Sequence, residues 1–457
     1  MLARKMKRNG HYSPELRSFA LTLHFYSPKA YNYVLKTWNN LLPNPSTIRN
    51  WCRVVDGAPG FTKEALDAIR IRAEEREKSG KAPVTVKLVS DDMSIRKELV
   101  YDKKRLIGGV DLGTRGNDDD FDNDNDNNED IEPASNALMF MAVSLNEYWK
   151  VPIGYFLFRT LNDDERANLI TEALRALHNA KCKVYSITFD GLSANFTMCT
   201  ILGANFEYGN NFKPYFINQA TGEKCFIFID LCHAIKLVRN TFGDLKVLTT
   251  TTSEQINDDD DDIVKLHAFQ TENGLTAANK LKKKHIDFKD NRMNVKLAMQ
   301  TLSKGVYSSL NFMTNIDDTV RREFECCLPT ANFCLQFNNM TDVLNCKNVF
   351  PKDKYDQPLT EDSYAELKAS TEEFEAYINI LCDRKGKPIL TCARKTGFLG
   401  IIICIRNMFD LFDEIKLLGQ KYLLTYKLSQ DFLETFFGAI RARGGFNNNP
   451  NANQKRV

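Results

Sequence analysis

Two apolar, β-branched segments of the chain each run directly into an aspartate. Residues 84–90 (VTVKLVS) precede Asp91, and residues 184–189 (VYSITF) precede Asp190. Runs of this length and composition are typical of buried or half-buried strands. A carboxylate at the end of each strand would reach the rim of the sheet. The pattern therefore predicts an α/β fold with two acidic groups at one edge of its sheet.

A third acid, Glu434, lies in a helical pattern near the C-terminus. Leu433, Phe436, Phe437 and Ile440 recur at three- and four-residue steps, so Glu434 lies beside an apolar stripe. A helix that packs on the sheet through this stripe would bring Glu434 towards the two strand ends. Two strand-end aspartates and one helix glutamate can therefore converge.

Three convergent carboxylates suit hard divalent cations. Mg²⁺ prefers carboxylates, water and phosphate oxygens, and two ions about 3.5 to 4 Å apart clamp the attacking and leaving oxygens of a phosphodiester. We therefore expect Asp91, Asp190 and Glu434 to hold Mg²⁺ or Mn²⁺ and to cut nucleic acid. The alternative is that all three are ordinary solvated acids at strand ends and in the first turn of a helix.

More than half of the chain separates Asp190 from Glu434, so a whole domain is expected to be inserted between them. Residues 226–240 (FIFIDLCHAIKLVRN) open this insert as a strand that runs into a helix, with Asp230, His233 and Lys236 near one face. Lys236 could meet a phosphate. The alternative is a helix-capping acid and a surface lysine. No GxxxxGK[ST] motif occurs, which excludes an ordinary P-loop.

The composition is that of a soluble protein with two or three domains. The chain has 457 residues, of which 43% are apolar and 11% aromatic. It has neither an 18-residue apolar run nor a signal peptide, so we expect an intracellular protein without a membrane partner. Twelve cysteines without a CxxC pair are expected to be reduced core residues.

The N-terminal end is strongly basic, although the net charge of the whole chain is only +2. Residues 1–55 contain nine Lys or Arg and one acid, which indicates a polyanion partner. Helices are expected over 13–26, over 27–38 and from Pro45 onward, which resembles a helix-turn-helix unit. Arg49 and Arg53 would then face DNA. The alternative is a solvated helical face, and a further helix over 62–79 would serve as a spacer or a dimer contact.

Two acidic stretches and one basic cluster complete the charge pattern. Residues 117–133 and 257–262 are rich in Asp and Asn and are expected to be mobile surface loops. A cluster inside the insert would track a DNA backbone without reading its sequence; it consists of Lys280, Lys282, Lys283, Lys284 and Lys289. A solvated lysine face is the alternative.

Several separate motifs together resemble the P-element and THAP-type transposase family, over about residues 13 to 453. They are residues 44–51 (NPSTIRNW), 91–96 (DDMSIR), 190–195 (DGLSAN), 230–240 (DLCHAIKLVRN) and 429–450, which begins SQDFLETFF. The resemblance implies a DNA transposase that acts on transposon ends and target DNA in the nucleus, as a homo-oligomer. By resemblance, Asp91, Asp190 and Glu434 are the catalytic triad of a ribonuclease H-like domain.

The same resemblance implies that the insert is a mainly helical domain that binds GTP as a cofactor without hydrolysing it. Residues that match nucleotide-contacting positions are Asp230, Lys236, Asn338, Asp342 and Asp431, with Asp342 as an acceptor for guanine N–H groups. The expected organisation is a helix-turn-helix region and spacer over 1–80, the first part of the ribonuclease H-like domain over 81–227, the GTP-binding insertion over 228–424 and the C-terminal catalytic helix over 425–457.

The chain also departs from the family pattern. The earliest cysteine is Cys52, so the N-terminal zinc-coordinating THAP module is expected to be missing. The end at Val457 indicates a C-terminal truncation, and Asp92 stands where the family more often has Glu. These departures leave a second hypothesis open, a domesticated DNA-binding protein without catalytic activity. A guanine-nucleotide switch is a third class, disfavoured because no hydrolytic loop is recognisable.

Overall fold

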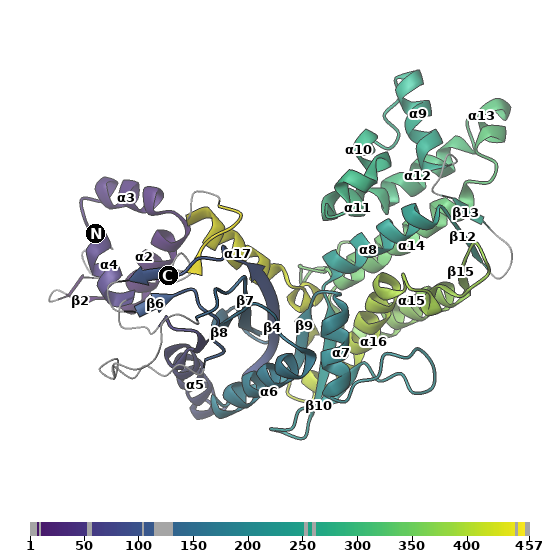
Figure 1. Cartoon of the computed structure of the whole chain (residues 1–457). Helices are drawn as coiled ribbons and strands as arrows, with labels where there is room; N and C mark the ends of the chain where they lie inside the picture. Colours follow the sequence, from purple (N-terminus) through teal and green to yellow (C-terminus); the bar gives the residue numbers. More distant parts are fainter. Residues whose placement is uncertain are drawn as a thin grey trace.

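The structure is a computed structural model that describes residues 7–8, 11–52, 57–102, 105–113, 131–250, 255–257, 262–443 and 447–452. Figure 1 shows a lobe that contains the N-terminal helices, the central sheet and the last helix, and a helical arm that extends from one edge of the sheet. Within the described residues no helix is long and apolar enough to cross a membrane.

Three short helices form the N-terminal region, as the sequence predicts. They are α2 (Pro14–Tyr26), α3 (Pro28–Thr37) and α4 (Pro45–Cys52), preceded by the strand pair β1 (Lys7–Arg8) and β2 (His11–Tyr12). Ser13 and Ser27 cap α2 and α3 by accepting backbone N–H bonds, and a proline occupies the first turn of each helix. A separate apolar core joins the helices; it contains Leu16, Ala20, Tyr31, Leu35, Leu42 and Ile48.

The central sheet has seven strands in the order β10-β11-β9-β4-β7-β8-β3. In chain order they are β3 (Gly60–Phe61), β4 (Thr85–Ser94), β7 (Asn136–Ser144), β8 (Lys150–Phe158), β9 (Lys183–Phe189), β10 (Tyr215–Ile217) and β11 (Lys224–Ile229). The pairs β4–β9 and β9–β11 are parallel, and the others are antiparallel. A separate hairpin is made by β5 (Val100–Asp102) and β6 (Arg105–Ile107).

Both expected strands are present, but β4 is longer than the sequence indicates. Pairing with β7 continues as far as Ser94, opposite Asn136. The prediction that Asp91 ends its strand is therefore wrong, because the ladder hydrogen bonds of β7 extend the strand past the acidic pair. Asp190, in contrast, does follow the last residue of β9.

Each face of the sheet packs against helices. On one face Val86 and Leu88 join a core with α5 (Lys63–Lys78) and α6 (Asp163–Asn179), and α7 (Ser193–Ile201) packs beside α6. The helix expected to be a spacer or a dimer contact is α5, whose Ile69 and Ala73 are buried in this core. On the other face α17 (Asp431–Arg443) inserts Leu433, Phe437 and Ile440 against β4 and β7.

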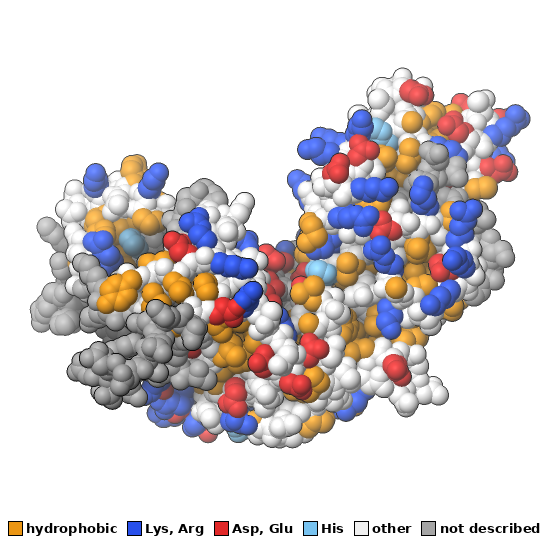
Figure 2. All heavy atoms as spheres, viewed as in Figure 1, with side chains coloured by type: hydrophobic (Ala, Val, Ile, Leu, Met, Phe, Trp, Pro, Cys, Tyr) orange, Lys and Arg blue, Asp and Glu red, His pale blue; other side chains and the backbone are white. Residues whose placement is uncertain are grey.

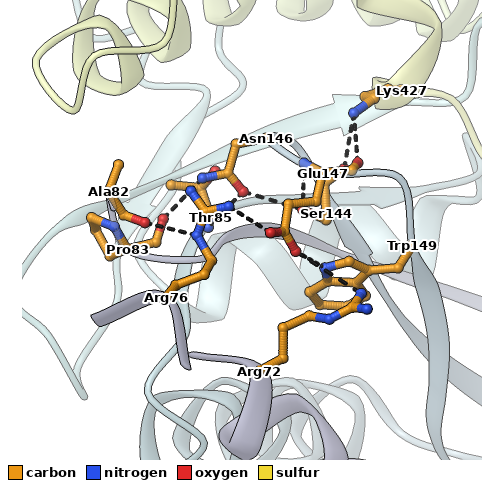
Figure 3. Close-up of polar contacts among 10 residues, drawn as sticks. All are labelled: Arg72, Arg76, Ala82, Pro83, Thr85, Ser144, Asn146, Glu147, Trp149 and Lys427. Atoms are coloured by element: carbon orange, nitrogen blue, oxygen red, sulfur yellow. Dashed lines mark hydrogen bonds and ion pairs between the residues drawn. The ribbon is translucent and has the colours of Figure 1, made fainter. Parts of the chain in front are cut away.

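A polar cluster at the turn between β7 and β8 holds two distant segments (Figure 3). Glu147 accepts hydrogen bonds from Arg76 of α5 at 2.5 Å and from the Trp149 indole at 2.7 Å. Lys427, which precedes α17, donates to the backbone carbonyls of Glu147 at 2.9 Å and Ser144 at 3.3 Å. Both α5 and the chain that leads into the last helix are therefore fixed to this turn.

The insertion is mainly helical, as expected. Its helices are α8 (Leu231–Leu245), α9 (Ile263–Asn273), α10 (Lys283–Ile286), α11 (Val295–Thr301), α12 (Lys304–Met313), α13 (Asp318–Glu323), α14 (Leu328–Leu344), α15 (Glu361–Ile380) and α16 (Thr396–Lys416). Short 3₁₀ turns are η2 (Phe288–Asn291), η3 (Ile389–Thr391) and η4 (Thr425–Leu428). Small strands accompany them, namely β12 (Val247–Thr250), β13 (Gln255–Asn257), β14 (Leu359–Thr360), β15 (Leu381–Asp383) and β16 (Tyr422–Leu423).

The long helix α16 packs directly on β11 and α8. A Cβ atom on Gly397 would lie 2.8 Å from the Ala234 carbonyl oxygen, and one on Gly400 would lie 3.2 Å from Ile229. These two glycines allow close approach of the backbones, so the insertion is joined to the edge of the sheet through a tight helix contact.

The acidic stretches lie largely outside the described residues, which omit 117–130 and 258–261. Asp262 is the exception within the second stretch. It is buried at the start of α9 and accepts a hydrogen bond from the Thr330 hydroxyl at 2.5 Å. The expectation of a surface loop is therefore wrong at Asp262, because its carboxylate bonds to α14.

Candidate active site

The adjacent acids Asp91 and Asp92 point to opposite faces of the sheet. Side chains alternate along a strand, so Asp91 shares the face of Val89 and Met93, which packs on α17. Asp92 points to the α6 side, where its carboxylate pairs with Arg166 at 2.8 Å. Only Asp91 is therefore directed towards the helix that carries Glu434.

Asp190 is held by the turn that follows β9. Its Oδ1 accepts the Asn195 side-chain amide at 2.7 Å and the Leu192 backbone N–H at 3.2 Å. Burial raises the pKa of Asp190, and these two hydrogen bonds oppose the rise. Asn195 is thus an orienting residue of the site. It lies in the segment DGLSAN, but no spacing rule marks it as such.

Asp190 and Glu434 both lie within electrostatic reach of Asp91. Burial, followed by the negative charge of Asp190 and then that of Glu434, raises the pKa of Asp91 to about 8. Glu434 is exposed on the first turn of α17, while its neighbours Leu433 and Phe437 are buried. A cation bound between Asp91 and its two acidic neighbours would relieve this repulsion and favour the ionised form of Asp91.

The oxygen-only donor set of Asp91, Asp190 and Glu434 fits Mg²⁺ or Mn²⁺, which prefer carboxylates. A tighter group lies nearby. Ligand atoms of Asp230, Cys232 and Asp431 come within 4.8 Å of one another, and in the described parts of the chain no other set of three His, Cys, Asp or Glu is as compact. Both carboxylate oxygens of Asp230 already accept backbone N–H groups, and the thiol is a soft ligand. This group therefore fits a structural role better than a hard cation.

Buried polar contacts hold the start of α17 on the sheet. Lys87 of β4 is fully buried and donates to the Ser429 carbonyl, while the Thr188 hydroxyl of β9 donates to the Leu428 carbonyl at 3.0 Å. Burial lowers the pKa of Lys87 to about 7, and Asp230 and Asp431 oppose this change. Lys87 is not among the site residues predicted from the sequence, although a lysine inside a buried strand, four residues before Asp91, is a recognisable signal.

The five predicted nucleotide contacts fall into two groups. Asn338 and Asp342 lie one turn apart on α14, and the Asn338 amide donates to the Asp342 carboxylate at 2.8 Å. Burial, together with Asp353 and Asp356, raises the pKa of Asp342 to about 6. The second group is at the starts of α8 and α17; it contains Asp230, Lys236 and Asp431. Their roles in nucleotide binding remain predictions.

The predicted DNA contacts lie on two parts of the molecule. Arg49 is exposed on α4, and Lys282, Lys283 and Lys284 are exposed at the start of α10, whereas Arg53 lies outside the described residues. Figure 2 shows the molecule hollowed between the N-terminal lobe and the helical arm, with acidic side chains at the base of the hollow and basic ones on its sides. Such a charge arrangement suits a DNA backbone above a metal site.

Four family models match successive parts of the chain. They are the transposable element P transposase-like HTH domain at 1–51, the TNP-like RNase H N-terminal domain at 57–203, the TNP-like GTP-binding insertion domain at 232–358 and the TNP-like RNase H C-terminal domain at 426–454. The chain belongs to the P-element transposase-like family. This membership accounts for the interrupted ribonuclease H-like fold and confirms the family and the fold that the sequence motifs indicate.

Two relatives show how much of the family pattern is present in this P-element transposase-like chain. DNA transposase THAP9 of Homo sapiens is 26% identical over 441 residues, which cover 95% of this chain and 46% of the relative. The transposable element P transposase of Drosophila melanogaster is 26% identical over 433 residues, covering 94% and 51% respectively. The chain thus spans about half of the length of each relative.

The fold is also similar to that of a solved structure. The Drosophila P element transposase strand transfer complex superposes with a TM-score of 0.72 at 24% identity, covering 99% of this chain and 92% of that one. The match extends over both the sheet and the insertion, so the placement of a helical domain between β11 and α17 is a shared feature of the fold.

Proposed function

We propose that the chain is a DNA transposase core that cleaves DNA and transfers strands at Asp91, Asp190 and Glu434. The observation that supports this proposal is that Asp91 lies on the sheet face covered by α17, the helix of Glu434, and beside the strand that leads into Asp190. Family membership supports the same reaction class. DNA, a homo-oligomeric assembly and a nuclear location belong to this proposal.

The chain's own residues define the geometry of the proposed reaction. Asn195 and the Leu192 amide fix Asp190, and the buried stripe of α17 fixes the turn that carries Glu434. Divalent cations bound between the carboxylates would supply charge neutralisation at the phosphate. Arg49 of α4 and Lys282–Lys284 at α10 would hold the DNA backbone from the N-terminal lobe and from the helical arm.

The proposal is tested by nicking and strand joining of plasmid DNA with Mg²⁺ or Mn²⁺ and GTP. Glu434→Gln keeps the shape of the side chain and removes its charge, so we expect cleavage to fall at least about 100-fold without loss of the fold. Asp164→Asn, an exposed acid on α6, is the matched control and should cleave like the unaltered protein. DNA binding without any cleavage by the unaltered protein would instead favour a domesticated DNA-binding protein.

We further propose that the insertion binds GTP, as the description of its family model suggests, and that it does not hydrolyse the nucleotide. Asn338 and Asp342 present an amide and a carboxylate side by side, which suits the N–H groups and the carbonyl of guanine. A nucleotide that also reached Asp230 and Asp431 would bridge α14 and the starts of α8 and α17, and so would link the insertion to the helix that carries Glu434.

Nucleotide titrations test the base contact. Asp342→Ala should weaken GTP binding more than ATP binding, because adenine has no N–H pair that needs this carboxylate. Asp353→Ala, which removes a nearby acid outside α14, is the control for general loss of charge. Equal losses for both nucleotides would remove Asp342 from base recognition.

A further inference from the structure

Lys236 is a buried cation without a close anionic partner. It lies in the second turn of α8 with 6% of its surface exposed, and its Nζ is 3.4 Å from Nδ1 of His233. Within the described parts of the chain, no carboxylate oxygen comes within 4.0 Å of this ammonium. Burial of an unpaired charge is costly, so packing alone does not explain a lysine at this position.

The start of α8 packs against the turn that carries Asp190. A Cβ atom on Gly191 would lie 3.0 Å from Cδ2 and 3.4 Å from Nε2 of His233, so the imidazole edge covers the backbone next to the catalytic acid. The positive charge of Lys236 also acts on Asp190, where it opposes the rise in pKa that burial causes. Lys236 and His233 therefore lie beside the carboxylate site.

The contact with Lys236 selects the tautomer of His233. An ammonium donates hydrogen bonds only, so Nδ1 of His233 must be the acceptor and the ring proton must lie on Nε2. That N–H faces the Asp190–Gly191 turn. Two hydrogen-bond donors, one of them charged, thus lie next to a group of carboxylates that are expected to hold cations.

We propose that Lys236 binds a phosphate of the DNA strand that is cleaved at Asp91, Asp190 and Glu434, and that His233 is its positioning residue. A phosphodiester carries the anionic oxygens that an unpaired lysine recognises, and Asp190 places the pair at the reacting end of the DNA. This inference deepens the proposed nuclease function and rests on it. It also gives Lys236 a different ligand from the nucleotide phosphate that the family resemblance implies.

The salt dependence of DNA binding tests the contact without cleavage. Affinities of the full chain for duplex and single-stranded oligonucleotides would be measured over a range of salt concentrations, in EDTA and without nucleotide. The association constant K falls as salt rises, so a plot of log K against log salt has a negative slope. Loss of one phosphate contact makes this slope shallower by about 0.9 for duplex and about 0.7 for single strands. Lys236→Met should show this loss, and Lys236→Arg should restore the slope.

Two controls separate this role from a structural one. Lys236→Met removes an unpaired buried charge and keeps the length of the side chain, so its melting temperature should be unchanged or higher. Lys368→Met removes an exposed lysine of α15 and should leave the slope unchanged. An unchanged slope in Lys236→Met for both kinds of DNA would overturn the proposal. If that variant also bound GTP more weakly, the nucleotide and not the DNA would be the ligand of Lys236.

Cleavage gives a second readout. Because the phosphate is held where charge develops, Lys236→Met should lower the cleavage rate at saturating DNA about 100-fold, and Lys236→Arg should recover most of it. If the unaltered protein does not cleave, the nuclease proposal fails. The phosphate contact would still stand on the salt slope, so the two failures are distinguishable.

Discussion

One carboxylate oxygen of Asp230 accepts the backbone N–H of Gln430 at 3.1 Å, which joins residues that are 200 positions apart. Its other oxygen accepts the His233 N–H at 2.9 Å and caps α8. The same buried side chain thus fixes the start of the insertion and the start of α17. Glu434 is placed relative to the sheet through this shared support.

We expect Asp230→Asn to weaken that support. The amide can replace only one of the two acceptor oxygens, which leaves a buried N–H unsatisfied and lowers the free energy of unfolding by about 1 to 3 kcal/mol. Chemical denaturation measures this loss. Asp383→Asn on β15 is the control, because one oxygen of Asp383 accepts both backbone N–H groups, those of Lys385 and Lys387, and the amide oxygen can replace it. Equal stability of Asp230→Asn and the unaltered protein would contradict the support role.

Asp91 and Asp92 should respond in opposite ways to the same substitution. The pKa of Asp91 is raised to about 8, above its unfolded value of 3.8, so its ionisation destabilises the metal-free fold progressively as pH rises between these values. Asp91→Asn should therefore raise the melting temperature at pH 7 and abolish cleavage. Asp92→Asn should lower the melting temperature, because it breaks the pair with Arg166.

The lowered pKa values of two buried lysines, Lys87 and Lys427, make the free energy of unfolding depend on pH in the alkaline range. The folded pKa of Lys87 is lowered to about 7 and that of Lys427 to about 8, while both remain near 10.5 in the unfolded chain. Unfolding therefore takes up protons, and stability rises with pH between about 8 and 10. Lys87→Met should reduce that slope by about 1.4 kcal/mol per pH unit. Urea denaturation at several pH values, with Lys427→Met for comparison, measures it.

Gly397 should not tolerate a methyl group. A Cβ atom there would lie 2.8 Å from both the Ala234 carbonyl oxygen and the Val238 nitrogen, which are backbone atoms that cannot move aside. We expect Gly397→Ala to lower the free energy of unfolding by about 1 to 3 kcal/mol. Gly305→Ala on α12, whose nearest neighbour is 3.6 Å away, is the matched control and should be neutral or stabilising.

Much of the fold could be predicted because its signals are local. Apolar, β-branched runs identify the strands that lead to Asp91 and Asp190, and serine followed by proline marks the starts of the helices capped by Ser13 and Ser27. The number of residues between Asp190 and Glu434 indicates an inserted domain. Each of these inferences needs only neighbouring residues or a count along the chain.

The supports of the site could not be predicted in this way. Lys87 meets Ser429, and Thr188 meets Leu428, across 342 and 240 positions. No local pattern specifies such partners, since they depend on how the insertion returns the chain to the sheet. The extension of β4 past Asp91 also depends on a second strand, β7, rather than on the residues of β4 itself.

The position of the insertion has a consequence for the time at which the site forms during synthesis. A nascent chain that has passed β9 already contains Asp91 and Asp190, but it gains Glu434 only after every helix of the insertion has been translated. Domains fold as units while the chain emerges, and contacts distant in sequence form late. The proposed carboxylate site therefore stays incomplete until the residues of α17 have left the ribosome.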